Sequence, residues 1–149
     1  MKNENPFSKV NIKTKDRVID VYLAKNKEIQ KKISKLNDSI NYDRGEILRI
    51  IQAEEGIRII LDERNLVHVT SIFSKPDIIS IKKNLAEVVL QFFPEAIKTR
   101  GIISTVSSSL NASDINIQEI MSSAPELILI LAGEDLIPAL TILNCLKEI

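Results

Sequence analysis

Apolar and polar residues follow a helical period near the start of the chain. Between residues 15 and 36, apolar positions recur at steps of three and four, and Lys occupies the remaining faces. This spacing predicts one amphipathic helix. Residues 37–45 are rich in Asn, Asp and Ser, whose side chains bond to the nearby backbone and end helices. We therefore expect a loop there.

Two antiparallel hairpins are predicted by short Ile-rich runs that flank turn residues. The runs are 46–53 with 57–62, and 115–122 with 127–132. Two further strands are expected at 78–82 and 86–92, on either side of Asn84. Helices are expected from Gly101 to about Leu110 and after each hairpin, where Asn65 and Asp135 are good N-caps.

An internal repeat connects these elements. A shift of 70 residues superposes 47–73 on 117–143 without a gap and with six identical positions. Upstream, residues 12–15 match 97–100 at a shift of 85, and each segment precedes a predicted helix. This order predicts two copies of one α-β-β-α unit, the first with the longer connection from helix to strand. The alternative is that any two Ile-rich hairpins match this well.

Composition excludes several classes of site. The chain has one His and one Cys, so a metal site built from such residues would lack the three or four ligands it needs, and we expect no metal. No acid, base and nucleophile share a spacing that would form an active site, so we expect neither catalytic residues nor cofactors. A lone Cys and the lack of an apolar leader favour the cytoplasm. The longest apolar run, 127–132, is too short for a membrane helix.

Charge is unevenly distributed, although Lys plus Arg and Asp plus Glu number 20 each. Residues 8–35 carry nine Lys or Arg against three acids, whereas 101–149 carry one Lys against six acids. The basic helix would either contact nucleic-acid phosphates, or stay solvated, or dock on the acidic half of another subunit. Because acids interrupt the basic face and only Tyr22 is available to stack on bases, nucleic acid is not the expected partner.

Residues 85–147 resemble the ACT family, whose small βαββαβ domains regulate amino-acid metabolism. The likeness lies in the order of its pieces, which are a strand, a turn into a helix at Thr99-Arg100-Gly101-Ile102-Ile103, a helix exit at 110–114, a strand opening at Ile115, a turn at 124–126 and a helix entered by Glu134-Asp135. The family usually has Pro at the position of Arg100 and often Gly at that of Asp114. The paired copies are similar to the tandem ACT lobe of aspartokinases, and most of all to small stand-alone archaeal ACT proteins.

The resemblance implies an α+β fold of two ferredoxin-like (βαββαβ) ACT-type units, in which antiparallel sheets carry helices on one face. The units are expected at residues 1–83, a degenerate copy with the basic helix, and at 84–149. The second copy lacks its last strand in the sequence. Strand 78–82 is therefore expected either to close the first unit or to take the place of the missing strand in the second.

The resemblance also implies a ligand site. A turn glycine lets another backbone come close, and the start of the following helix offers N–H groups to a carboxylate. In the family the other side of the ligand meets the start of the second strand, often from a partner domain. The corresponding ligand-binding residues here are Thr99, Arg100, Gly101, Ile102, Ile103, Asp114, Asn116 and Ile117. In the first copy Asp16 takes the place of the glycine, so a matching site is not expected there. The alternative for the second copy is that Gly101 only turns the chain and that no ligand binds.

The function implied is that of a non-enzymatic regulatory protein that binds an amino acid or similar small ligand at an ACT-domain interface. We expect a homodimer or higher homo-oligomer, because a single chain would leave sheet edges and Ile-rich helix faces exposed. A protein partner in amino-acid metabolism is also expected. One alternative is a ligand-responsive transcriptional regulator whose basic N-terminal helix contacts DNA, and another is a structural adaptor that binds neither.

Overall fold

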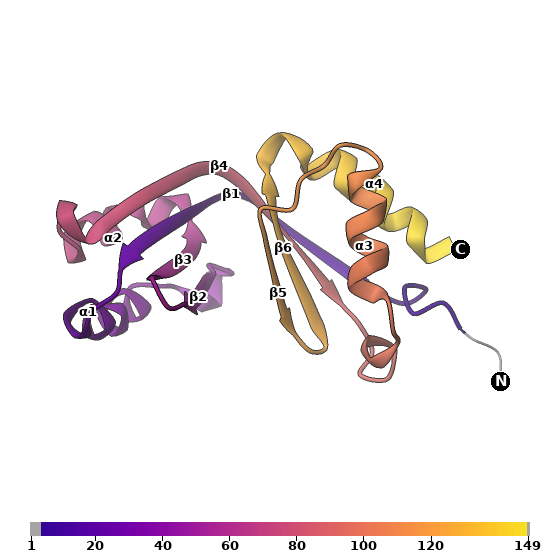
Figure 1. Cartoon of the computed structure of the whole chain (residues 1–149), viewed down its shortest axis with the longest axis horizontal. Helices are drawn as coiled ribbons and strands as arrows, with labels where there is room; N and C mark the ends of the chain where they lie inside the picture. Colours follow the sequence, from indigo (N-terminus) through magenta and orange to yellow (C-terminus); the bar gives the residue numbers. More distant parts are fainter. Residues whose placement is uncertain (1–3, 149) are drawn as a thin grey trace. The chain divides into compact units, whose positions relative to one another are not determined.

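The structure of the chain, a computed structural model, describes residues 4–148 and combines helices and strands in one α+β fold (Figure 1). The sequence correctly predicts this fold class. The elements are β1 (Asn11–Ala24), α1 (Lys27–Asp38), β2 (Leu48–Gln52), β3 (Gly56–Asp62), α2 (Leu66–Ile72), β4 (Ile78–Gln91), α3 (Ile102–Asn111), β5 (Glu119–Ser123), β6 (Glu126–Ala132) and α4 (Leu136–Cys145).

The described residues form two compact units that share two long strands. Residues 17–84 make one unit, which we call the inserted unit, and residues 4–16 with 85–148 make the other, which we call the outer unit. Strands β1 and β4 are each 14 residues long, and each contributes one part to each unit. Arg17 and Asn84, at the two divisions, both have positive φ. Such backbone is uncommon for residues other than glycine, so the division coincides with a local break in strand geometry.

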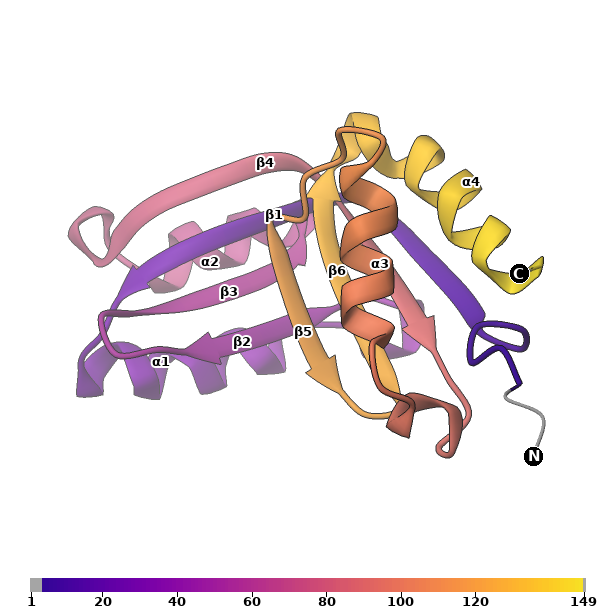
Figure 2. The same cartoon turned by 45° about the vertical axis from the view of Figure 1, so that its right-hand side comes forward.

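The inserted unit has the complete βαββαβ order. Its strands pair in the order β2-β3-β1-β4, with β1 and β2 each antiparallel to β3. Helices α1 and α2 pack together on one face of these strands (Figure 2). Between helices and strands lies a core in which Ile19, Leu36 and Ile59 are fully buried. Burial of such aliphatic side chains is the main source of stability in a unit of this size.

The outer unit completes the same architecture with a strand from the other end of the chain. Its strands pair in the order β1-β4-β6-β5, and α3 packs beside α4 (Figure 1). The part of β1 before Arg17 supplies the strand that follows α4 in the βαββαβ order. Phe7 and Val10, just before β1, are buried in the same core as Val88 and Leu129. The second copy therefore obtains its last strand from the start of the chain.

This arrangement differs from the expected division into residues 1–83 and 84–149. Residues 4–16 group with the second copy, and 78–84 group with the first. The single strand β4 also replaces the two strands expected at 78–82 and 86–92. A division at a single point in the sequence assigns all of β1 to the first unit. Nothing in residues 4–16 themselves shows that they pair with the second copy.

The hairpin registers confirm the repeat at a shift of 70. Ile50 pairs with Ile59 in the first hairpin, and Ile120 pairs with Leu129 in the second. The four-residue match at a shift of 85 is wrong, because residues 12–15 lie inside β1 and not before a helix. The connection from helix to strand is longer in the first copy, as predicted, because residues 39–47 join α1 to β2 whereas residues 112–118 join α3 to β5.

The predicted helix over residues 15–36 is correct only in its second half. Residues up to Ala24 form β1, where the β-branched side chains of Val18, Ile19 and Val21 suit a pleated, buried strand. The side chain of Asn26 then accepts a hydrogen bond from the Ile29 N–H at 2.9 Å, which is an N-cap. A local break at residues 25 and 26 therefore separates strand from helix.

The remaining predicted elements lie close to their observed positions. Both hairpins form, although β5 begins four residues later than the expected 115, and the helices after them begin at Leu66 and Leu136. Helix α3 begins directly after Gly101, as predicted. None of the helices formed by residues 4–148 is long and apolar enough to cross a membrane.

Candidate functional site: the start of helix α3

A pocket of about 490 Å³ lies in the outer unit at the amino-terminal end of α3. We call it the α3 pocket. One wall is the segment that leads into α3 together with its first turn, and the other is the β5–β6 hairpin. The lining residues are Ile97, Lys98, Thr99, Gly101, Ile102, Ile103, Ser104, Ser122, Ala124 and Leu127. Its volume falls in the range of pockets that hold small organic ligands.

Gly101 sets the entry into the helix. Its φ of 85° lies in the left-handed region, which a side chain disfavours. A Cβ atom at this position would meet no atom within 4 Å, so backbone conformation rather than crowding is the reason for glycine. The Gly101 carbonyl accepts the first helical hydrogen bond, from the Thr105 N–H at 2.8 Å.

The electrostatics of the α3 pocket suit an anion. The first N–H groups of an α-helix have no partner within the helix, and they carry the positive end of its dipole. No acidic residue lies in the first turn of α3, and no side chain caps it. The pocket lining contains Lys98 but no carboxylate; the Lys98 ammonium lies 3.3 Å from the exposed Glu95 carboxylate. A ligand carboxylate would therefore meet positive potential and N–H donors.

Hydroxyl and apolar groups complete the lining. Thr99, Ser104 and Ser122 can each donate and accept a hydrogen bond. The floor is apolar, because Ile102 and Leu127 are buried members of the core. The pocket thus combines an anion seat with neutral donors and an aliphatic surface.

The predicted site residues fall at two ends of one helix. Thr99, Gly101, Ile102 and Ile103 line the α3 pocket, whereas Arg100 is exposed and is not part of the lining. The other three, Asp114, Asn116 and Ile117, follow the far end of α3. Since α3 has 10 residues, its two ends lie about 15 Å apart. Within one unit these two groups do not meet.

Six lining residues were not among those predicted. Ile97, Lys98 and Ser104 directly flank the predicted motif, so a wider window would have included them. The β5–β6 hairpin contributes Ser122, Ala124 and Leu127 through sheet pairing, in which Gln91 at the end of β4 lies opposite Glu126. The Pro125 carbonyl also accepts a hydrogen bond from the Phe92 N–H at 2.9 Å. A sequence shows the hairpin but not which strand end it lies beside.

The inserted unit closes the equivalent position with its own side chains. The prediction that Asp16 corresponds to Gly101 is wrong, because Asp16 lies in β1. The residue that precedes the first helix is Asn26. Its side chain occupies the start of α1 as a cap. Next to it, the Lys25 ammonium donates to the Ala53 carbonyl at 2.7 Å. The start of α1 is thus satisfied internally, in contrast to that of α3.

Solved structures of other proteins share this architecture. A putative C-terminal regulatory domain of aspartate kinase from Porphyromonas gingivalis W83 has a TM-score of 0.63 at 14% identity, covering 92% of this chain and 96% of that one. The regulatory subunit of aspartate kinase from Thermus thermophilus has a TM-score of 0.65 at 13% identity, covering 91% of this chain and 94% of that one. The fold is of the ACT type. This confirms the predicted pair of ACT-type units.

A whole aspartate kinase shares the fold over part of its length. The enzyme from Clostridium acetobutylicum has a TM-score of 0.72 at 16% identity. The match covers 92% of this chain but 34% of the enzyme, so the chain spans about a third of that protein. No protein-family model matches the sequence, and no curated protein is similar to it. The likeness to stand-alone archaeal ACT proteins stays a prediction.

Proposed function

We propose that this chain is a non-enzymatic regulatory protein that binds an amino acid, or a similar small carboxylate, at an interface between ACT-type units of two subunits. The observation that carries the proposal is the uncapped start of α3, which opens into the α3 pocket. The contrast with α1, where Asn26 occupies the same position, supports one ligand site per chain rather than two.

A second subunit would complete the site. The carboxylate of an amino acid would bind the N–H groups at the start of α3, and its ammonium would need an acceptor such as Asp114. Because Asp114 lies about 15 Å away at the other end of α3, the acceptor would come from the partner subunit. The pocket rim also carries Ile103, an apolar side chain that is 49% exposed and that a partner would cover. Ligand and subunit contact would then depend on each other.

Regulation would follow from this dependence. A ligand that binds only the assembled interface favours that arrangement of subunits over others, and a partner protein can read the difference. Two of the similar structures are named as a regulatory domain and a regulatory subunit of aspartate kinase. We therefore expect the partner to be a cytoplasmic enzyme of amino-acid metabolism.

A calorimetric screen of the twenty amino acids tests the proposal, with thermal denaturation of the same samples as an independent readout. We expect at least one amino acid to bind with one site per chain and to raise the melting temperature by mass action. Absence of binding heat together with an unchanged melting temperature for all twenty would refute ligand binding. Sedimentation with and without the ligand measures the expected link to dimerisation.

A second candidate function is DNA binding through α1. The exposed residues Lys27, Lys31 and Lys35 recur every four positions and form one basic stripe on this helix, whereas Lys32 lies 3.7 Å from the Asp77 carboxylate. A transcriptional regulator would use this stripe on DNA phosphates. Binding that weakens steeply with salt, and further on charge reversal of Lys31 and Lys32, would favour it. Salt-independent or absent binding would leave the stripe as a solvated face.

A further inference from the structure

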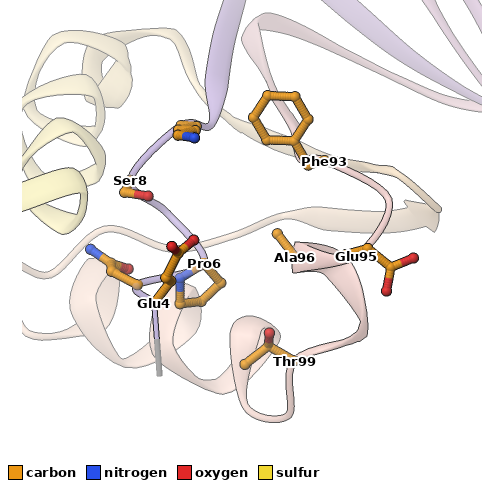
Figure 3. Close-up of a pocket in the computed structure, with 9 residues that line it drawn as sticks. Glu4, Pro6, Ser8, Phe93, Glu95, Ala96 and Thr99 are labelled. Carbon is orange, nitrogen blue, oxygen red and sulfur yellow. The ribbon is translucent and has the colours of Figure 1, made fainter. Parts of the chain in front are cut away.

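A second pocket lies in the outer unit, beside the segment that leads into α3. It has a volume of about 260 Å³ and lies between the start of the chain and the loop after β4 (Figure 3). We call it the N-terminal pocket. Its lining residues are Glu4, Asn5, Pro6, Ser8, Lys9, Phe93, Glu95, Ala96 and Thr99. Apart from Thr99, none of them lines the α3 pocket.

The N-terminal wall of this pocket is anchored to the core. Phe7 is 5% exposed and makes an edge-to-face contact with Phe92, with ring centroids 5.5 Å apart. The Asn5 side chain joins this wall to the residues after α4, because its amide donates to the Leu146 carbonyl at 2.7 Å. Its oxygen also accepts a hydrogen bond from the Phe7 N–H at 2.9 Å. Residues 5–10 are further tied by two turn hydrogen bonds. The wall is therefore preorganised, which lowers the entropy cost of binding a ligand.

The lining presents one ammonium and two carboxylates beside an apolar surface, and one of these carboxylates, that of Glu95, lies 3.3 Å from the Lys98 ammonium. The Glu4 carboxylate comes from the N-terminal wall, and the Lys9 ammonium lies 5.9 Å from the centre of the Phe93 ring. Phe93 is 58% exposed, an unusual position for a phenyl side chain. Figure 3 shows Glu4 and Pro6 on one side of the pocket and Phe93 and Ala96 on the other. Hydroxyls of Ser8 and Thr99 add donors and acceptors.

We propose that the N-terminal pocket binds a small zwitterion, an α-amino acid with an apolar side chain. The ligand's ammonium would pair with Glu4 and its carboxylate with Lys9. The apolar side chain would lie against Pro6, Ala96 and the Phe93 ring, which removes their surface from water. A volume of 260 Å³ equals that of about nine water molecules, which suits a ligand of this size and not a nucleotide.

This site is independent of the proposed function, because it uses neither Gly101 nor a second subunit. The two pockets nevertheless share Thr99, and the short 3₁₀ turn η4 (Ala96–Lys98) lies between them. Ala96 faces one pocket, whereas Ile97 and Lys98 line the other. Occupation of both pockets by one class of ligand would therefore act on the same turn.

The test uses the full chain with Gly101→Val, so that the α3 pocket does not contribute. L-leucine is titrated while the backbone amide signals of Ser8 and Ala96 are followed by NMR. We expect saturable shifts of both signals. Leucine methyl ester, which lacks the carboxylate, and 4-methylpentanoate, which lacks the ammonium, should each bind at least about tenfold more weakly because one charged contact is lost.

Variants assign the contacts. Glu4→Gln and Lys9→Met should each weaken leucine binding about three- to tenfold. Glu134→Gln is the matched control, because Glu134 is an exposed carboxylate of the same unit that lines neither pocket; it should keep the leucine affinity within about twofold. Absence of saturable shifts at Ser8 and Ala96, or equal affinity in Glu4→Gln and Lys9→Met, would overturn this proposal. If leucine shifts the Ile102 signal in the parent chain and this shift is lost in Gly101→Val, without any shift at Ser8 or Ala96, binding at the α3 pocket would be supported and binding at the N-terminal pocket refuted.

Discussion

Gly101→Val separates the ligand site from the fold. At φ 85° a side chain is strained, and a β-branched one more than alanine. The left-handed conformation costs about 1–2 kcal/mol for a residue with a Cβ. No atom lies within 4 Å of that Cβ, so no clash adds to this cost. We expect the free energy of unfolding to fall by about 1–2 kcal/mol, with the fold intact.

Ligand binding should respond far more strongly than stability. The valine methyl groups would enter the α3 pocket beside the N–H groups of Ile102 and Ile103, where the ligand carboxylate is proposed to lie. A displaced carboxylate loses its charge-assisted hydrogen bonds. We expect at least about a tenfold loss of affinity, equivalent to about 1.4 kcal/mol.

Gly45→Val is the matched control. Gly45 has φ 79°, also has no atom within 4 Å of a built Cβ, and follows a surface 3₁₀ turn in the inserted unit. Its backbone strain should therefore match that of Gly101→Val, whereas ligand affinity should stay that of the parent chain. Urea denaturation measures stability, and calorimetry with the amino acid found in the screen measures affinity.

Three results would refute this reasoning. Equal affinity in Gly101→Val and the parent chain would move the ligand site away from α3. Equal loss of affinity in Gly101→Val and Gly45→Val would mean that binding follows global stability rather than the geometry of the pocket. A fall in the free energy of unfolding of more than about 4 kcal/mol in Gly101→Val would mean that the valine side chain disrupts packing, in contrast to the expected cost from backbone strain alone.

Three further changes test the packing of the inserted unit. Asn26→Ala removes the cap of α1 and should lower the free energy of unfolding, measured in urea, by about 1 kcal/mol; no change would show that the cap contributes nothing. Arg58→Met removes the guanidinium that lies 2.7 Å from the Asp20 carboxylate, which is 2% exposed, and should cost about 2–3 kcal/mol; a loss below about 0.5 kcal/mol would contradict this role. Hydrogen bonds from Ser74 lower the pKa of Asp77 below 3.8, so the small stabilisation they give is present at neutral pH and lost as the pH falls through the lowered pKa. An NMR titration of Ser74→Ala should show the pKa of Asp77 rising toward 3.8, and an unchanged value would refute this cause.

Local features could be predicted from the sequence because their causes are local. The hairpins follow from Ile-rich runs around a turn, and the start of α3 follows from Gly101, whose conformation the structure shows to be left-handed. The ACT-type fold could be inferred from the order of such pieces in residues 85–147. The hairpins and the start of α3 depend on contacts between residues that are close in the sequence.

Features that depend on pairing between distant segments could not be predicted. Apolar residues at 18, 19, 21 and 23 fit either a helix or a buried strand, and only their pairing with β3 decides for the strand. The supply of a strand by residues 11–16 depends on a partner more than 70 positions away, as the hydrogen bond from the Asn11 amide to the Gln91 side chain illustrates. Ser122 and Ala124 reach the α3 pocket for the same reason.

The central claim, an amino acid bound at the start of α3 with help from a second subunit, is tested most directly by a crystal structure grown with the amino acid that binds in the calorimetric screen. The account predicts ligand density beside Gly101, with the carboxylate on the N–H groups of Ile102 and Ile103 and the ammonium near Asp114 of the partner subunit. Ligand bound away from α3, or held at α3 by a single chain without any contribution from a partner, would contradict it.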